Sequence, residues 1–334
     1  MLRVARPRHR PPAPVAGSDN RRYDSHTVPP LVSINIPCYR QLPAVRRCLA
    51  AMLAQTLADF EITLLDDGAS DEYRAMVESL GDPRVVYQRN PVRLGAMRNM
   101  FQAITAGRGR YTLAFHEDDL LGAEYLATTV AILEADPRCG FVAGVLREFD
   151  APPAAEALRL RPAPPEVDRF ASPADFLRVI FRGAEPMFGS VVYRRAAVES
   201  LAPALDEFAT LVDRPFLMDI LGAWSGALIR DPLVWYGRHG DGDERHLAMR
   251  TDHILRLFTR YRAALPAPLS AADRALFYAY SGYWLFTLYR LTPPADRAPL
   301  RQFVVQAWHA GLYNPQWSAG LGRKRLIGLL LTGR

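Results

Sequence analysis

The sequence predicts an α/β protein, built on a mostly parallel sheet flanked by helices and followed by an all-helical C-terminal extension. Two observations support this prediction. Between residues 31 and 145, short apolar runs rich in β-branched residues alternate with segments whose apolar residues recur at helical spacing. This alternation is typical of βαβ units and a parallel sheet. Beyond residue 242, three segments rich in Leu, Tyr, Phe and Trp indicate helices, at 245–263, 271–291 and 298–311.

The first strand is expected at 31–37, where a short apolar run ends at Pro37. The helix after it has Pro43 suited to a first turn and an apolar face that includes Leu42, Val45 and Leu49. The other strands of this half are expected at 61–65, 84–88, 111–115 and 140–145, and the helices between them at 71–80, 95–106 and 122–135.

The second half of the chain follows no regular alternation. A segment rich in Pro, Ala and Glu at 151–165 is expected to be an exposed loop. Ser172, followed by Pro173 and Asp175, indicates a helix start, because serine caps a helix and proline suits its first position. A strand is expected at 189–193 and a helix at 213–222.

The composition argues against several classes of protein. Of the 334 residues, 49% are apolar and 23% are charged, which is ordinary for a globular protein. No run reaches the ~20 apolar residues of a spanning helix, and the Arg- and Pro-rich segment 1–26 lacks the apolar core of a secretory signal. Three scattered cysteines are too few for a disulfide framework or a zinc cluster, which predicts a cytoplasmic location. The net charge of +6 comes without a basic stripe interleaved with aromatics, so no nucleic-acid partner is expected.

Polar residues follow three of the expected strands, at the edge where parallel sheets bind ligands. They are residues 37–40 after the first strand, Asp66 and Asp67 after the second, and residues 116–119 after the fourth. Consecutive carboxylates repel one another unless a cation offsets their charge, and oxygen ligands suit Mg²⁺ or Mn²⁺. Because the sequence has neither a GxxxxGK[ST] nor a GxGxxG loop, we expect substrate phosphates to be held through that metal.

An ordered set of motifs resembles the family 2 glycosyltransferases over roughly residues 30–240. In chain order the motifs are Pro37-Cys-Tyr39, Gln55-Thr56, Phe60-Glu-Ile62, Leu65-Asp-Asp-Gly68, the segment 90–99 closing in Arg98-Asn99, Ala106-Gly107, Phe115-His-Glu-Asp-Asp119, Gly189-Ser-Val-Val-Tyr193, Leu205-Asp-Glu-Phe208, Asp213 and Tyr236-Gly-Arg-His239. The resemblance implies a GT-A fold and transfer of a sugar, with inversion at the anomeric carbon, from a nucleoside diphosphate donor, UDP being favoured.

The expected domain organisation follows from this resemblance. We expect the GT-A domain at 30–243, with its nucleotide-binding part at 30–150 and its acceptor part at 151–243. A disordered segment at 1–29 would precede it, and a helical region at 244–334 would follow it.

The resemblance also assigns the donor pocket. It implies that Pro37 and Tyr39 line the base and ribose pocket. It implies that Asp66, together with Asp67, accepts a hydrogen bond from the base, and that Arg98 lies near the nucleotide.

A metal and diphosphate site is implied next to this pocket. By the same likeness, Asp118 is the metal ligand of a D-x-D signature, with Asp119 beside it and Glu117 directed toward the ribose. His239, with Arg238, is implied to approach the metal and the diphosphate. The first position of the signature is His116 instead of an aspartate, which puts the metal affinity in question.

Asp213 is implied as the general base that deprotonates the acceptor hydroxyl. The family motif at this point reads Glu-Asp, whereas this chain has Val212 before Asp213, so a single carboxylate carries the role. Asp206 and Glu207 are the fallback candidates.

Several alternatives stay open at this stage. The acceptor is expected to be a glycan, a lipid-linked molecule or a small molecule. The tail at 323–331 combines three cations with an apolar stripe, which fits either peripheral contact with the inner membrane or docking on the domain. The apolar segment 276–289 fits a buried helix or a homo-oligomer interface. A non-catalytic relative that binds a carbohydrate or nucleotide as a scaffold subunit is the rival function.

The site residues also have structural interpretations. Residues 66–68 suit a turn, Asp118 and Asp119 a helix-dipole pair, Asp213 a helix cap, and His239 a structural histidine.

Overall fold

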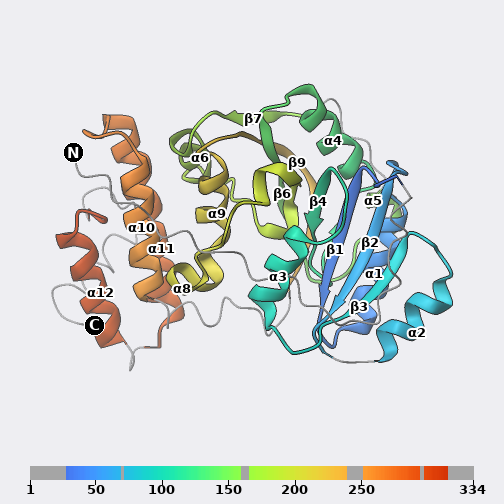
Figure 1. Cartoon of the computed structure of the whole chain (residues 1–334). Helices are drawn as coiled ribbons and strands as arrows, with labels where there is room; N and C mark the ends of the chain where they lie inside the picture. The colour runs from blue at the N-terminus through green and yellow to red at the C-terminus, as the bar shows by residue number, and fades with distance from the viewer. Residues whose placement is uncertain (1–27, 69–70, 159–164, 239–250, 294–296, 315–334) are drawn as a thin grey trace.

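A nine-stranded mixed sheet lies at the centre of the computed structural model, which describes residues 28–68, 71–158, 165–238, 251–293 and 297–314 (Figure 1). The strand order is β3-β2-β1-β4-β8-β6-β9-β5, and β7 pairs with β9. The strands are β1 (Val32–Cys38), β2 (Phe60–Asp66), β3 (Val85–Arg89), β4 (Tyr111–Ala114), β5 (Leu120–Leu121), β6 (Cys139–Phe149), β7 (Val167–Phe170), β8 (Val191–Arg194) and β9 (Ser225–Gly237).

Helices cover both faces of this sheet. The helices of the first half are α1 (Leu42–Leu53), α2 (Asp71–Leu80), α3 (Ala96–Thr105), α4 (Tyr125–Ala135) and α5 (Ala155–Leu158). Those of the second half are α6 (Pro173–Ile180), the 3-10 turn η1 (Phe188–Ser190), α7 (Arg195–Val198), α8 (Leu205–Phe208), the 3-10 turn η2 (Ala209–Leu211) and α9 (Asp213–Ile220). Helices α10 (Thr251–Ala264), α11 (Ala271–Leu291) and α12 (Arg297–His309) form the C-terminal layer.

The first half of the sheet is parallel, as the sequence predicts. Strand β1 lies between β2 and β4, and the register puts Cys38 opposite Asp66 at the carboxyl edge. The second half is mixed, because β8 runs antiparallel to both β4 and β6, whereas β6 and β9 are parallel. The predicted α/β class with C-terminal helices is confirmed.

Local sequence signals explain most element ends. Ser172 Oγ accepts a hydrogen bond from Asp175 N at 3.2 Å, so the predicted helix start at the beginning of α6 is confirmed. Three predictions need correction. The expected strand at 189–193 begins as η1, the expected loop at 151–165 contains α5, and the strand expected at 140–145 continues to residue 149.

Strands β5, β7 and β9 were not expected from the sequence. Strand β9 is the longest of the sheet, but its sequence carries Arg230, Asp231 and Pro232 in the middle, which interrupts the apolar run. Its pairing with β6 has two register shifts, so it bends and shows no strict alternation. The positions of its residues are therefore set by tertiary pairing.

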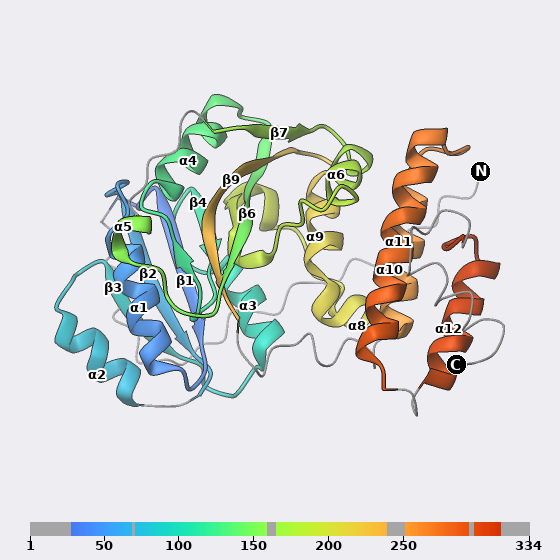
Figure 2. The ribbon, with the colours of Figure 1, turned by 180° about the vertical axis from the view of Figure 1, so that it is seen from behind.

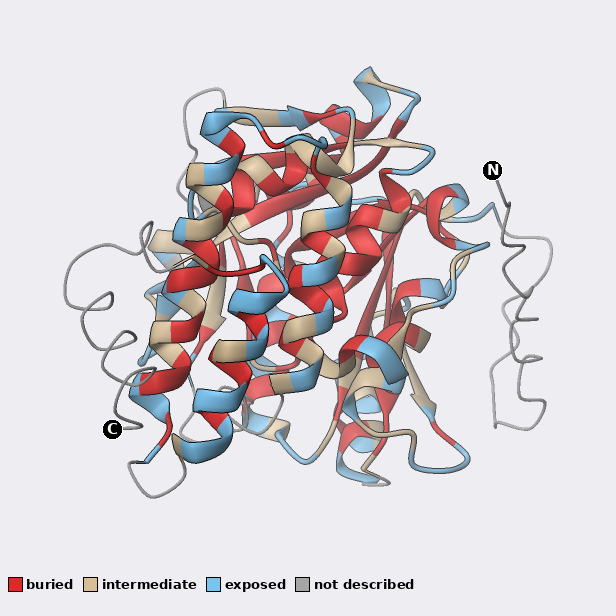
Figure 3. Cartoon of the chain, turned by 90° about the vertical axis from the view of Figure 1, so that its left-hand side faces the viewer, coloured by how far each residue is buried: buried red, intermediate tan, exposed pale blue. Residues whose placement is uncertain are grey.

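Two hydrophobic cores lie on opposite faces of the sheet. One is formed with α1, α2 and α4, and the other with α3, α6 and α9. The second core continues into the C-terminal layer, so α9 lies between the sheet and these helices (Figures 1 and 2). The buried residues of α10, namely Ile254, Leu257, Phe258 and Tyr261, recur at helical spacing along one face. Figure 3 shows this pattern of buried and exposed positions from the outer side of the layer.

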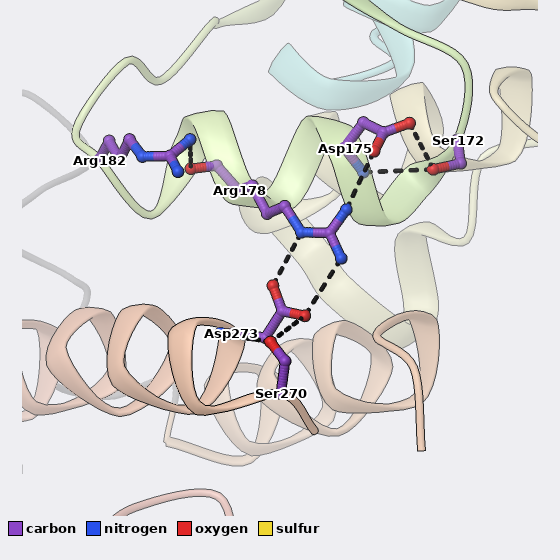
Figure 4. A network of polar contacts seen from close by, with 6 residues as sticks. All are labelled: Ser172, Asp175, Arg178, Arg182, Ser270 and Asp273. Carbon is purple, nitrogen blue, oxygen red and sulfur yellow. Dashed lines mark hydrogen bonds and ion pairs between the residues drawn. The ribbon is translucent and has the colours of Figure 1, made fainter. Parts of the chain in front are cut away.

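A polar network also attaches the C-terminal layer to the second half. Arg178 of α6 donates from Nε to Asp273 Oδ1 at 2.7 Å and from Nη2 to Oδ2 at 3.1 Å (Figure 4). This bidentate pair joins α6 to the first turn of α11. Ser270 caps α11 by accepting from Asp273 N at 3.0 Å.

Some sequence predictions fall outside the described residues. These are the segment 1–27 of the expected disordered terminus, His239, the first residues of the expected helix at 245–263, and the tail at 323–331. None of the helices that the structure describes is both long enough and apolar enough to span a membrane.

Candidate active site

The carboxyl ends of β1, β2 and β4 bring the predicted polar clusters together. Tyr39, just after β1, donates its backbone N–H to Glu117 Oε1 at 2.9 Å and Oε2 at 3.0 Å, and the Tyr73 hydroxyl donates to Oε2 at 3.2 Å. Burial, together with the charges of Asp118 and Asp66, raises the pKa of Glu117 to about 7, although the hydrogen bonds from Tyr39 and Tyr73 oppose this rise. A carboxyl group that changes protonation near neutral pH therefore lies at this edge.

Asp66 and Asp67 face different surroundings. Asp66 is fully buried, and its carboxylate accepts from Gly68 N at 2.8 Å and from the Tyr87 hydroxyl at 2.7 Å. Asp67 accepts from Leu94 N at 2.7 Å and from Gly95 N at 2.8 Å. Both oxygens of Asp67 thus hold the loop before α3, while Asp66 lies beside Tyr39 at the edge.

Two arginines flank the ring of Tyr39, a residue expected in the donor pocket. The guanidinium carbons of Arg93 and Arg40 lie 4.5 and 5.1 Å from the ring centroid. Arg40 has a φ of 60°, in the left-handed region that non-glycine residues rarely adopt. Arg98 is exposed on α3 and Pro37 is half-buried near the end of β1. Arg93 was not singled out from the sequence, because an exposed arginine in a loop carries no pattern of its own.

His116, Asp118 and Asp119 form an acidic cluster after β4. One ligand atom of each residue lies within 4.8 Å of the others. His116 Nδ1 is 3.0 Å from Asp119 Oδ2, and Gly237 N donates to Asp119 Oδ1 at 2.9 Å. Burial acts to lower the pKa of His116, but the hydrogen bond to Asp119 and the charges of Asp118 and Asp213 outweigh it and raise that pKa. The imidazole thus replaces the expected first carboxylate as a member of the same cluster.

This donor set fits a divalent transition metal. An imidazole nitrogen and two carboxylates suit Mn²⁺, whereas Mg²⁺ prefers oxygen ligands alone. The structure holds Asp119 through both of its oxygens, and Asp118 is half-buried beside it.

The backbone at Gly189 closes one side of the cluster. A Cβ atom there would lie 3.1 Å from His116 Nδ1 and 3.5 Å from Asp119 Oδ2. Because real Cβ atoms seldom come so close to other atoms, glycine allows η1 to pack against the imidazole.

Asp213 is the first residue of α9 and is 8% exposed. Its Oδ1 accepts from Arg214 N at 2.8 Å. Burial raises the pKa of Asp213, and the Arg214 guanidinium partly opposes that shift. The charge of Asp213 helps to raise the pKa of His116, so the base candidate is within electrostatic reach of the acidic cluster.

A second carboxylate reaches this region from elsewhere in the chain. Glu185, in the loop after α6, forms an ion pair with Arg214 and raises the pKa of Asp213. The fallback candidates Asp206 and Glu207 are exposed on α8. Glu185 lies 28 residues before Asp213 in no recognisable motif, so sequence reasoning missed it.

Arg238 follows β9, where Gly237 contacts Asp119. Its guanidinium pairs with Glu148 at 3.2 Å and with Asp150 at 3.0 Å, and all three side chains are exposed. In the described part of the chain, Arg238 is thus paired away from the cluster.

Comparison with known proteins identifies the family. Residues 33–200 match the family model described as Glycosyl transferase family 2. A glycosyltransferase of Bacillus subtilis, EpsJ, is 30% identical over 199 residues, which are 56% of this chain and 55% of the relative. The UDP-Glc:alpha-D-GlcNAc-diphosphoundecaprenol beta-1,3-glucosyltransferase WfgD of Escherichia coli is 28% identical over 103 residues, which are 31% of this chain and 41% of that protein.

A solved structure matches most of the chain. It is the mannosyltransferase PcManGT from Pyrobaculum calidifontis in complex with GDP-Man and Mn²⁺, with a TM-score of 0.54, 20% identity and coverage of 92% of this chain and 89% of that one. The chain spans only about a tenth to about a half of the length of the curated relatives that it matches. The family model matches half of the chain and the GT-A fold extends over nearly all of it, so this chain belongs to glycosyl transferase family 2.

Proposed function

We propose that this chain is an inverting glycosyltransferase that uses a divalent metal and Asp213 as general base. It moves a sugar from a nucleoside diphosphate donor, with UDP favoured, to a hydroxyl of a glycan, lipid-linked or small-molecule acceptor. The observation that carries the proposal is that the charge of a buried carboxylate, Asp213, acts on His116 of the acidic cluster, whose members lie at the carboxyl edge of the sheet.

The roles of the donor-side residues follow the family resemblance and the contacts at the edge. Pro37, Tyr39 and Asp66 are the proposed base and ribose pocket, with Arg98 near the nucleotide. Glu117 is the proposed ribose contact, which its hydrogen bond to Tyr39 N supports, because that bond holds it beside the pocket. Asp67 is proposed to assist the contact of Asp66 with the base indirectly, because its own two oxygens accept hydrogen bonds from the loop before α3.

Asp118, Asp119 and His116 are the proposed metal ligands, and the family resemblance adds His239 and Arg238 as residues toward the metal and the diphosphate. For Arg238 this role requires its guanidinium to leave the exposed pairs with Glu148 and Asp150. A cation bound there supplies positive charge that stabilises a departing diphosphate. Mn²⁺ or Mg²⁺ is proposed, and the Mn²⁺ of the PcManGT complex supports the former.

The chemical step needs a base on the acceptor side. The acceptor hydroxyl gives its proton to an Asp213 carboxylate oxygen as its oxygen bonds to carbon 1 of the sugar. The bond from carbon 1 to the phosphate oxygen breaks, and its electron pair leaves with the nucleoside diphosphate. Attack and departure on opposite faces invert the anomeric carbon. The raised pKa of Asp213 supports this role, because a carboxylate of ordinary pKa is a weak base.

The names of two relatives support the substrate classes. The donor and acceptor in the name of WfgD, UDP-Glc and a diphosphoundecaprenol-linked sugar, support a UDP-sugar donor and a lipid-linked acceptor. GDP-Man in the PcManGT complex keeps a GDP-sugar among the donors to be tested. A cytoplasmic location, peripheral membrane contact through the tail at 323–331 and a homo-oligomer remain part of the proposal.

Thermal unfolding with a nucleotide-sugar panel tests the donor site. UDP-glucose, UDP-N-acetylglucosamine and GDP-mannose are each added with and without Mn²⁺. We expect one of them to raise the midpoint in a Mn²⁺-dependent way, because a ligand at about 100 times its dissociation constant adds about 2.7 kcal/mol of stability. Equal midpoints for all conditions would remove the donor assignment.

Release of the nucleoside diphosphate then tests catalysis. Asp213→Asn is expected to keep the Mn²⁺-dependent shift and lose turnover, while Asp219→Asn, at the far end of α9, keeps both. His116 at the first position of the D-x-D signature is the observation that favours one rival, a non-catalytic relative that binds a carbohydrate or nucleotide as a scaffold subunit. Donor binding by the unaltered protein without any nucleotide release supports that rival. Loss of turnover in Asp206→Asn, with Asp213→Asn active, moves the base to α8.

A further inference from the structure

We infer that Arg214 is a positioning residue for Asp213, and that its buried ion pair with Glu185, covered by Trp284, makes helix α11 part of the support of the reaction centre. This inference rests on the proposed function, because it concerns how the proposed base is held.

Arg214 is a buried charged side chain at the start of α9. It is 8% exposed and forms its ion pair with Glu185 through Nη2. Its guanidinium carbon lies 5.7 Å from the ring centroid of Trp284 on α11. A buried guanidinium is stable only where a carboxylate offsets its charge, so Glu185 and Arg214 constrain one another strongly. The pair therefore fixes the loop after α6 against the start of α9.

Asp213, the proposed general base, is the residue next to Arg214. Asp213 precedes Arg214 and accepts from its backbone N–H at 2.8 Å, so the orientation of the carboxylate follows the first turn of α9. A shift of that turn would therefore shift the Asp213 carboxylate with it. Misplacement of a reacting group by about 1 Å can slow a reaction about a hundredfold.

The other end of the same loop reaches the acidic cluster. Four residues after Glu185, the backbone of Gly189 packs against His116. Ser190 Oγ accepts a hydrogen bond from Met187 N at 3.2 Å, which closes η1. The ion pair thus connects the two segments that flank His116, one carrying Asp213 and the other carrying Gly189. The segment with Asp213 and the segment with Gly189 therefore both depend on the ion pair of Arg214 with Glu185, which packs against α11 through Trp284.

A second attachment of α11 provides the matched control. The bidentate pair of Arg178 with Asp273 joins α6 to α11, but neither residue contacts the acidic cluster or Asp213 in any contact that the structure describes (Figure 4). A variant that breaks this pair loosens α11 without touching the start of α9.

The experiment compares five variants: Glu185→Gln, Arg214→Met, the double variant Glu185→Gln/Arg214→Met, Arg178→Met and Asp213→Asn. Each is measured for thermal midpoint, for the KM and kcat of nucleotide release from the donor found in the panel, and for amide hydrogen exchange. Both single variants at the pair leave one group uncompensated and are expected to lower the midpoint. The double variant removes both charges and is expected to recover the midpoint.

The inference predicts that recovery of stability does not bring recovery of the reaction. The double variant is expected to keep the donor KM within about threefold and to lose at least tenfold in kcat. The backbone amides of the non-proline residues in 185–190 and 213–216 are expected to exchange faster in this variant than in the unaltered protein. Arg178→Met is expected to lose stability and to keep kcat.

Two results would overturn the inference. One is a double variant with both midpoint and kcat of the unaltered protein. The other is an Arg178→Met variant with the same loss of kcat as Arg214→Met, which would make docking of α11 the whole effect. Failure of the proposed function has a different signature, because Asp213→Asn would then keep full kcat while the exchange data still report on the pair.

Discussion

Tyr39 donates its backbone N–H to both carboxylate oxygens of Glu117, at 2.9 and 3.0 Å, and so ties the end of β1 to the acidic run after β4. The two strands are neighbours in the sheet, and the contact holds a buried acid where the proposed ribose pocket meets the proposed metal ligands. The Glu117 carboxyl group interacts with four other ionisable groups, namely Asp118, Asp66, the Tyr73 hydroxyl and the Cys38 thiol.

Glu117→Gln is expected to stabilise the metal-free protein above neutral pH. Burial raises the folded pKa from the usual 4.5 to about 7, so the native state binds a proton that the unfolded state has released. Stability of the unaltered protein therefore falls as the pH rises from about 4.5 to about 7, by about 3 kcal/mol. Urea unfolding in EDTA at pH 5 and pH 8 measures this change. The fall in Glu117→Gln should be smaller by this amount, because among the described residues only His116 and Asp213, whose pKa values are also raised, then contribute to it, whereas Glu134→Gln, an exposed control, should keep the full fall. Equal pH dependence in both variants contradicts the assignment.

Asp67→Ala is expected to destabilise the protein by about 2–3 kcal/mol, because it leaves the amides of Leu94 and Gly95 without their acceptor. Urea unfolding measures the loss, and hydrogen exchange should speed up at those two amides. Asp71→Ala is the control, since that side chain is 88% exposed and should change stability by less than about 0.5 kcal/mol. An Asp67→Ala variant as stable as the control would show that the loop before α3 keeps its conformation without the Asp67 carboxylate.

Gly189→Ala is expected to weaken Mn²⁺ binding about tenfold, because the added Cβ would lie 3.1 Å from His116 Nδ1 and displace the ring from Asp119. Calorimetric titration with Mn²⁺ measures the affinity. The double variant His116→Ala/Gly189→Ala tests the cause, since the added methyl should have no further effect once the imidazole is gone. Additive losses in the double variant would place the effect elsewhere in η1.

Sequence reasoning located the carboxyl edge because parallel strands must end together there. Asp66 ends the buried strand β2 and Asp118 lies in the run after β4, so strand direction places both at this edge. The sequence could not tell which of Asp66 and Asp67 faces the proposed donor pocket. Successive residues at a strand end point to opposite sides, and the hydrogen-bond partner of each comes from a distant segment. Those partners, Tyr87 for Asp66 and the amide of Leu94 for Asp67, come from 21 and 27 residues further along the chain.

The acceptor side was harder to predict for a physical reason. Glu185 and Arg214 are adjacent only after the loop that follows α6 has folded onto α9, and no local pattern encodes that contact. Strand β9, which carries Gly237 to Asp119, was missed because tertiary pairing overrides its interrupted sequence. Most elements of the first half were thus predicted from their own sequence, whereas contacts between two distant segments were not.

Asp273→Asn is expected to lower stability by about 2 kcal/mol at pH 7, because Arg178 loses its charged partner between α6 and α11. The hydrogen bonds from Arg178 hold the pKa of Asp273 below its usual 3.8. A depressed pKa stabilises the fold above that usual value, and the contribution is lost as the pH falls through the folded pKa. The difference between the variant and the unaltered protein should therefore shrink from pH 7 to pH 3 in urea unfolding. Asp82→Asn, whose pairing with Arg84 lowers its pKa in the same way, should show the same trend with pH but leave amide exchange in α11 unchanged. A deficit of constant size at both pH values would mean that the amide disturbs the packing of α11 and that the ion pair contributes nothing.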